Sequence, residues 1–135
     1  MSKLRNTLGA AVLGVAALSL ASIAAVGAEG PTVKRTVLLQ QDIAGGMTMS
    51  EVQVDIPVGG REGRHMHPGP LMVHVVEGTL TLDYEGKPTN SYKPGDTFFV
   101  EAGKIHEGIN RGNAPIKAIA TFVTEKGKPL TTQAQ

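Results

Sequence analysis

The alternation of apolar and polar residues is the main pattern of this chain after residue 28. It is most regular in the segment Met47–Ile56, where one set of alternate positions carries Val52, Val54 and Ile56 and the other carries Glu51, Gln53 and Asp55. A period of two residues places the two sets on opposite faces of an extended chain. The segment therefore predicts a half-buried β-strand.

Further short segments are apolar or alternating and are bounded by glycine or proline; they cover residues 33–40, 71–76, 79–84, 97–100, 105–110 and 115–123. Turn residues recur about every 8–12 positions, as in all-β domains. After residue 28 no segment keeps a helical period over three turns. These features predict an antiparallel sandwich or barrel with its core in residues 33–124. Residues 125–135 are polar and are interpreted as a tail.

The first 28 residues have the pattern of a secretory signal peptide and not of the folded domain. Lys3 and Arg5 precede an apolar stretch over residues 8–26, and Val26-Gly27-Ala28 offers small residues for a cleavage site. The alternative is an uncleaved membrane anchor, because an apolar stretch of this length nearly spans a bilayer. We expect a periplasmic or secreted protein whose single domain covers residues 29–135.

Charge and cysteine content narrow the classes of partner. Without Lys3 and Arg5, the domain has 11 of the 13 basic residues against 12 acidic ones, a net charge of −1. This balance offers no basic surface for nucleic acid or for an anionic membrane. The absence of cysteine excludes disulfides, thiolate ligands and thiol catalysis. We therefore expect no nucleic-acid partner, and no membrane partner after cleavage.

Three of the four histidines suggest a metal site. His65 and His67 are two residues apart and so share one face of a strand, whereas His106 lies in a later glycine-bounded segment. They can converge only if the sheet folds back on itself. Neutral imidazoles bind zinc, copper, iron and nickel, and three nitrogen ligands leave positions open for chemistry. Taken alone, a His-x-His pair is a weak signal, and a single histidine in a strand is usually structural.

The spacing of these residues resembles the two motifs of the cupin superfamily over residues 59–110. The first motif is matched by Gly59, His65, His67, position 71 and Gly78, and the second by Gly95, position 101, Gly103, His106 and Asn110. The resemblance implies an antiparallel jelly-roll barrel, often a homodimer, with one divalent metal held by His65, His67 and His106. Cupins include dioxygenases, isomerases, decarboxylases, lyases and binding proteins without catalysis, so the fold does not select the function.

Two positions depart from the cupin pattern. Leu71 occupies the position where the family usually has a metal-binding glutamate, and Glu101 occupies one that is usually proline. A site of three histidines without a carboxylate resembles that of some cupin dioxygenases, whose substrates chelate the metal through two oxygens. It favours an anionic or chelating molecule. The alternatives are a degenerate site that binds metal weakly, or a replacement carboxylate from Glu51 or Glu101.

The residues predicted to contact the substrate are Arg64, Leu71 and Phe99. Arg61 and Arg64 flank the histidine pair at the expected barrel mouth, where a guanidinium can bind a carboxylate through two hydrogen bonds. The alternative for both arginines is a solvated loop position. Leu71 and Phe99 are expected on the barrel wall.

Other residues that can bind metals are assigned to packing or to the surface. By strand alternation His74 faces away from position 71, so we interpret it as a non-ligand. Thioethers beside imidazoles suit copper, and the chain has several methionines near the motifs: Met47, Met49, Met66 and Met72. Alternation places them away from the histidines, which favours packing or an interface.

These features predict an exported, single-domain cupin with one divalent transition metal: zinc, copper, iron, manganese or nickel. A protein that is exported unfolded acquires its ion outside the cytoplasm, where the affinity order favours copper and zinc. The predicted activity on a small oxygenated or carboxylate-bearing molecule is dioxygenase-, isomerase- or lyase-like. The alternatives are a non-catalytic carrier of metal or ligand, and a structural dimer with a vestigial site.

Overall fold

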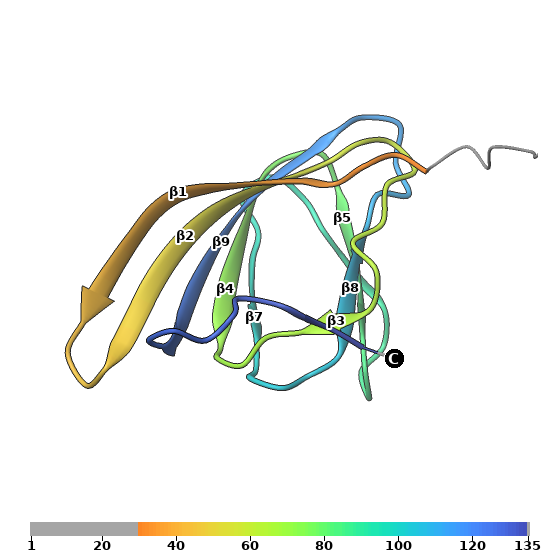
Figure 1. Ribbon diagram of the computed structural model, residues 1–135. Coiled ribbons are helices and arrows are strands. Elements are labelled where there is room, and N and C mark those ends of the chain that lie inside the picture. The colour runs from red at the N-terminus through yellow and green to blue at the C-terminus, as the bar shows by residue number, and fades with distance from the viewer. Residues whose placement is uncertain (1–29, 135) are drawn as a thin grey trace, which may run out of the picture.

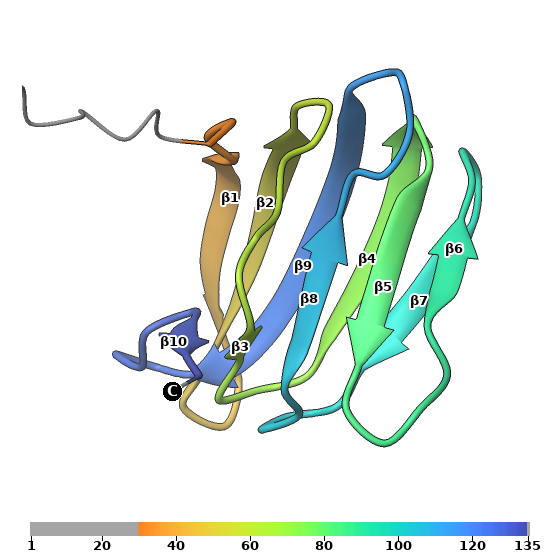
Figure 2. The same ribbon diagram turned by 90° about the vertical axis from the view of Figure 1, so that its right-hand side faces the viewer.

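The computed structural model describes residues 30–134, and in that range ten β-strands form two five-stranded sheets. The two sheets face each other as layers in Figure 1, and Figure 2 shows them from the side of the second sheet. Every strand pairing is antiparallel. The all-β jelly-roll prediction is therefore confirmed. The predicted signal peptide lies outside the described residues.

The first sheet contains, in spatial order, β1 (Lys34–Ile43), β2 (Met47–Ile56), β9 (Ile116–Glu125), β4 (Leu71–Glu77) and β7 (Thr97–Val100). The second contains β10 (Thr132–Gln133), β3 (His65–Met66), β8 (His106–Ile109), β5 (Leu80–Tyr84) and β6 (Asn90–Tyr92). Neighbouring strands are mostly not consecutive in sequence, because the chain crosses repeatedly from one sheet to the other. This crossing brings the two histidine segments to the same sheet.

The core lies between the sheets and follows the alternation seen in the sequence. In β2, Val52, Val54 and Ile56 point inward, as predicted. The neighbouring strand β9 alternates in the same way, and the register pairs Val54 with Ala118. In β4, Leu71, Val73 and Val75 are buried, while His74 is exposed. The period of two thus fixes which side chains form the wall of the barrel.

Asn110, the last residue of the second motif, holds the loops at one end of the barrel. Its side-chain amide donates to the carbonyl oxygens of Ile56 (3.0 Å) and Ala114 (2.9 Å), and its Oδ1 accepts from the Gly112 N–H at 3.0 Å. These bonds join the end of β2 to the loop that leads into β9. Because the Asn110 side chain is buried, these three hydrogen bonds satisfy its polar atoms away from water.

The C-terminal residues do not form the separate tail that the sequence suggests. The chain turns after β9, and β10 pairs with β3, so that Thr132 lies opposite Met66 and Gln133 opposite His65. Figure 2 shows this short strand at the edge of the second sheet, beside β3. A two-residue strand has no detectable period, which is why the sequence pattern missed it.

Strand β1 lies at the edge of the first sheet and is exposed along its whole length. It runs to Ile43, three residues beyond the predicted end, because it pairs with the whole of β2 through a hairpin. In Figure 1 this hairpin projects past the second sheet on the left of the view. Its exposed apolar residues are Val37, Leu38, Leu39 and Ile43. Among the described residues there is no helix long and apolar enough to cross a membrane.

Candidate metal centre

The structure brings His65, His67 and His106 together inside the barrel. His65 begins β3, His106 begins β8, and these two residues are direct partners in the sheet. His67 follows β3, and its side chain points to the same side as that of His65. All three side chains are buried, their ring centroids are 4.4 to 4.9 Å apart, and one ring nitrogen from each lies within 4.8 Å of the others. Such a cluster is compact enough to hold one ion.

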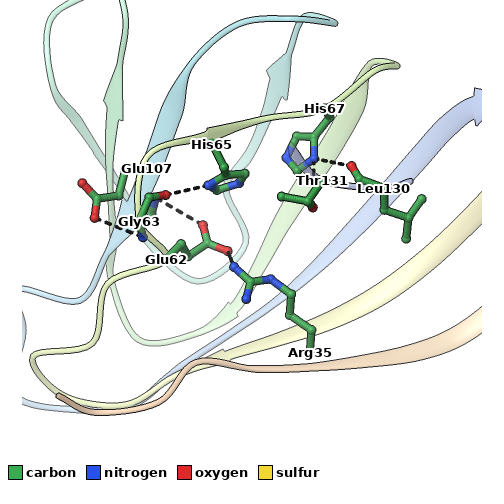
Figure 3. A network of polar contacts seen from close by, with 9 residues as sticks. Arg35, Glu62, Gly63, His65, His67, Glu107, Leu130 and Thr131 are labelled. Atoms are coloured by element: carbon green, nitrogen blue, oxygen red, sulfur yellow. Dashed lines mark hydrogen bonds and ion pairs between the residues drawn. The ribbon is translucent and has the colours of Figure 1, made fainter. Parts of the chain in front are cut away.

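Each of the three imidazoles is oriented by a backbone carbonyl. The Nδ1 atom of His65 lies 2.7 Å from the Gly63 oxygen, that of His67 lies 2.7 Å from the Leu130 oxygen, and that of His106 lies 2.9 Å from the Lys104 oxygen. Figure 3 shows the first two of these bonds. A carbonyl can only accept, so Nδ1 carries the proton in each ring and Nε2 carries the lone pair. This tautomer and this second contact are those of metal-binding histidines.

Burial keeps two of the rings neutral. It lowers the pKa of His67 and of His106 from 6.5 to about 4, although the bonds to the Leu130 and Lys104 carbonyls act in the opposite direction. At neutral pH both rings therefore have an unprotonated nitrogen available to a cation. The donor set, its burial and its tautomers all fit a transition metal ion.

An ion pair between the exposed Arg61 and the buried Glu107 supports the loop that orients His65. Arg61 donates to both carboxylate oxygens of Glu107, at 2.9 and 2.6 Å, and the Gly63 N–H donates to the same carboxylate at 3.2 Å. The hydrogen bonds from Arg61 are the main cause of the lowered pKa of Glu107. The pair holds Gly63 in place, so that the Gly63 carbonyl can accept the hydrogen bond from His65 Nδ1. Arg61 is thus engaged with Glu107 and does not line the cavity.

The histidines lie at one side of a cavity of about 130 Å³ whose wall is mainly apolar. Leu71 lines it, and the Phe122 ring makes an edge contact with His67 at 5.0 Å. The other apolar side chains of the wall come from both sheets: Val37, Val52, Val54, Val73, Leu80, Leu82, Phe98, Ala118, Ala120 and Leu130. The cavity therefore suits a small molecule with an apolar body.

Of the three predicted substrate contacts, the structure brings only Leu71 to the cavity. The side chain of Arg64 is 49% exposed and lies 3.7 Å from Asp83 outside it. Phe99 is 58% exposed and lines a shallow outer pocket instead. Strand alternation explains the position of Phe99, because the buried Phe98 occupies the inward position of β7 and its neighbour must point outward.

Two charged residues of the cavity wall were not found from the sequence. Arg35 on β1 and Glu62, just before the histidine pair, both line the cavity, and the Arg35 Nη2 donates to Glu62 Oε1 at 3.0 Å. They belong to no recognisable motif. One indirect signal exists: Gly108 lies two residues after His106, on the same strand face, and its missing side chain leaves room for a neighbour.

Neither of the carboxylates suggested as a replacement for the missing glutamate joins the cluster. Glu101 accepts hydrogen bonds from the Tyr84 hydroxyl and from Lys87, and Glu51 lies on the outward set of β2 positions. In residues 30–134, the only group of three or more possible ligands is the histidine cluster itself. His74 lies outside it, with its Nδ1 2.9 Å from the Thr97 hydroxyl.

Comparison with known proteins agrees with this architecture. The model of the cupin domain matches residues 52–122. An auxin-binding protein of Prunus persica is 32% identical over 82 residues, which cover 57% of this chain and 38% of that protein. The chain therefore spans well under two thirds of this relative's length.

Solved structures show the same fold at low sequence identity. A cupin-like protein of Thermotoga maritima has a TM-score of 0.64 at 22% identity, covering 76% of this chain and 75% of that one. The DMSP lyase DddQ of Ruegeria pomeroyi has a TM-score of 0.65 at 19% identity, covering 76% of this chain and 51% of that one.

Proposed function

The chain belongs to the cupin domain family, and from this premise we propose that His65, His67 and His106 bind one divalent transition metal. The metal site in turn acts on a small oxygenated or carboxylate-bearing molecule. One observation carries the proposal: three buried imidazoles converge while each Nδ1 is committed to a backbone carbonyl. That arrangement leaves one ring nitrogen of each histidine without a hydrogen-bond partner in the protein, at the cavity and within reach of a single cation.

The surroundings of the cluster define what the site can do. A bound divalent metal supplies Lewis-acid polarisation of a substrate oxygen or lowers the pKa of a bound water. Leu71, in place of a carboxylate, leaves the metal charge uncompensated and favours an anionic or chelating ligand. The apolar wall excludes water and strengthens electrostatic interactions inside the cavity. Dioxygenase-, isomerase- or lyase-like chemistry on a small molecule fits these features, and one structural neighbour is named as a lyase.

Export determines which metal the protein meets. If residues 1–28 direct the chain to the periplasm or the medium, the ion is acquired there, and the affinity order favours copper or zinc over iron and manganese. The three nitrogen donors are compatible with each of these ions. The metal is therefore best identified in protein produced with its own N-terminal segment.

Metal analysis by mass spectrometry of protein isolated from its native compartment tests the proposal. We expect close to one equivalent of one transition metal, and loss of that metal together with turnover in His65→Ala and His106→Ala. His74→Ala is the matched control, because His74 is exposed and outside the cluster. Less than about a tenth of an equivalent of any transition metal in the native protein would contradict the proposal.

The second candidate is a non-catalytic binding protein. It is favoured by the predominance of apolar side chains around the cavity and by the name of the Prunus persica relative, an auxin-binding protein. A carrier predicts that ligand addition raises the melting temperature while no product forms. A thermal-shift screen of metals and dicarboxylic or enediol compounds, followed by product analysis of each hit, separates the carrier from the enzyme.

A further inference from the structure

Within the part of the chain that the structure describes, the cavity wall has only two charged side chains, Arg35 and Glu62. Arg35 comes from the edge strand β1 and Glu62 from the loop before β3, 27 residues further along the chain. Figure 3 shows the pair next to the loop that orients His65. A charged pair in an otherwise apolar wall has a cost of desolvation, so its position calls for a functional reason.

Glu62 is fixed by the strand that carries His106. Its Oε2 accepts from the Gly108 N–H at 3.2 Å, its Oε1 accepts from Arg35, and its side chain is only 13% exposed. A Cβ at position 108 would overlap this carboxylate, so the absence of a side chain there makes the contact possible. The carboxylate is thus placed by the backbone of the metal-site strand and holds the guanidinium at the cavity.

Arg35 keeps hydrogen-bonding capacity for a ligand. Its guanidinium has five N–H donors, and its one hydrogen bond in the described structure is from Nη2 to Glu62. Its side chain is 39% exposed, so the remaining donors are reachable.

From this geometry we infer that Arg35 selects the ligand of the cavity by binding an anionic group, and that Glu62 positions the guanidinium. The ligand is a small molecule with an apolar body, which packs against the wall, and a carboxylate or a similar anionic group, which meets Arg35. The inference deepens the proposed function, because it assigns a ligand class and a selecting residue to the same cavity. Arg64, the arginine expected from the sequence, has no part in it.

Calorimetric titration of the metal-free full-length domain with three probes of equal chain length tests the inference. The probes are hexanoate, hexan-1-ol and hexylamine, which have six carbons each and carry an anionic, a neutral and a cationic head group. Removing the metal with EDTA prevents the carboxylate from binding to the ion directly. The variants are Arg35→Gln, Glu62→Gln and Arg64→Gln, with Arg111→Gln as a control for the loss of one positive charge on an exposed loop.

We expect the wild type to bind hexanoate about tenfold or more tightly than hexan-1-ol, as a charge-assisted hydrogen bond predicts. Hexylamine should bind more weakly than either. Arg35→Gln should remove the preference for hexanoate while leaving hexan-1-ol unchanged, and Arg64→Gln and Arg111→Gln should keep it. Glu62→Gln should raise hexanoate affinity severalfold, because it removes a competing negative charge and retains an acceptor for Gly108.

The inference is overturned if the wild type does not prefer hexanoate, if Arg35→Gln keeps the preference, or if Arg64→Gln abolishes it. The metal content of Arg35→Gln, measured in parallel, should equal that of the wild type. This readout separates the two claims. A protein that binds no metal contradicts the proposed function, yet its preference for hexanoate still decides the role of Arg35.

Discussion

At the scale of single residues, the proton on each histidine decides what the cluster can bind. Two of the three carbonyl partners are local, because Gly63 and Lys104 each precede their histidine by two residues. The third, Leu130, comes from the other end of the chain. Position 71 then decides whether a carboxylate completes the donor set, and here it is an apolar side chain that lines the cavity.

Replacing Leu71 with glutamate should restore the usual cupin donor set. We expect metal affinity to rise by roughly tenfold or more, while the metal-free protein becomes less stable by about 2 kcal/mol because an ionised carboxylate is buried without a partner. Leu71→Gln is the matched control, because glutamine has the shape of glutamate but no charge. Competition titrations and thermal unfolding with and without metal measure both effects. Equal metal affinity in the two variants would contradict the assignment of position 71 to the site.

Acid should destabilise the metal-free protein. The folded-state pKa of His67 and His106 is lowered to about 4, below the ordinary value of 6.5, so the unfolded chain binds more protons between these two pH values. The free energy of unfolding is therefore highest above pH 6.5 and falls as the pH drops toward 4. Metal binding should weaken in the same direction, because protons compete for the ring nitrogens.

Urea unfolding of the metal-free protein across this pH range measures the effect. The double variant His67→Gln and His106→Gln should show a flatter dependence on pH, whereas His74→Gln should follow the wild type. A wild-type unfolding midpoint that does not change between pH 6.5 and 4 would show that these two rings are not buried in neutral form.

At the scale of elements, the site depends on a strand and on a crossover that the sequence pattern did not reveal. Strand β10 adds to the edge of β3 and supplies the Leu130 carbonyl just before it. The segment between β3 and β4 crosses from one sheet to the other against β9, where the Val123 N–H donates to the Pro70 carbonyl at 3.1 Å. Both contacts position His67, because this residue lies in the segment between β3 and β4 and its ring meets the Leu130 carbonyl.

Ending the chain after Lys126 should weaken the metal site without unfolding the barrel. The truncation removes β10 and the Leu130 carbonyl, so the His67 ring loses the partner that fixes its tautomer. We expect a 10- to 100-fold loss of metal affinity with an unchanged far-ultraviolet circular dichroism spectrum. Thr131→Val removes only the weaker 3.3 Å contact to His67 and should change affinity little. Full affinity in the truncated chain would show that β10 does not support the site.

Gly69→Ala should destabilise the whole barrel. Gly69 lies in the crossover, and a Cβ there would overlap the backbone oxygen of Val123. Because the clash is with backbone, the strand must shift, and we expect a loss of about 3 kcal/mol in the free energy of unfolding. Gly30→Ala is the control, since a Cβ there meets nothing within 4 Å. Chemical denaturation compares the variants, and equal stability would contradict the close approach.

At the scale of the whole molecule, the two sheets enclose one cavity and leave one apolar edge exposed. The expected homodimer stays a prediction. The exposed strand β1, with Val37, Leu38 and Leu39 at 58, 48 and 54% exposure, is the surface on which we expect a second subunit to pack. Arg35 lies on the same strand, so packing at β1 would also affect access to the cavity.

Analytical ultracentrifugation measures the oligomeric state. We expect the mass of a dimer for the wild type and a shift toward monomer in Leu39→Asp, because a charge placed in an apolar interface is costly. Thr36→Asp adds the same charge at a polar position of β1 and should stay dimeric. A monomeric wild type at micromolar concentration, or a dimeric Leu39→Asp, would show that β1 is not the interface.

Local patterns in the sequence determined the longer strands and the three histidines. The period of two assigned Val52, Val54 and Ile56 to the core and His74 to the surface, because side-chain direction in a strand depends only on position along the chain. The spacing of the two motifs predicted that the histidine segments belong to one barrel. The same alternation, applied to Phe98 and Phe99, would have identified the inward ring once the face of β7 was known.

Only the tertiary structure decided which other residues share the site with the histidines. Arg35, Glu62 and Leu130 meet the cavity through contacts between segments that are 27 to 63 residues apart. Such contacts depend on the order and the register of strands in two sheets, and no local period encodes either. The position of the proton on His67 Nδ1 also depends on such a contact, because its acceptor, the Leu130 carbonyl, lies 63 residues further along the chain. The three histidines of the cluster could thus be identified from the sequence, whereas the orientation of their rings and the charged residues of the cavity wall required the folded barrel.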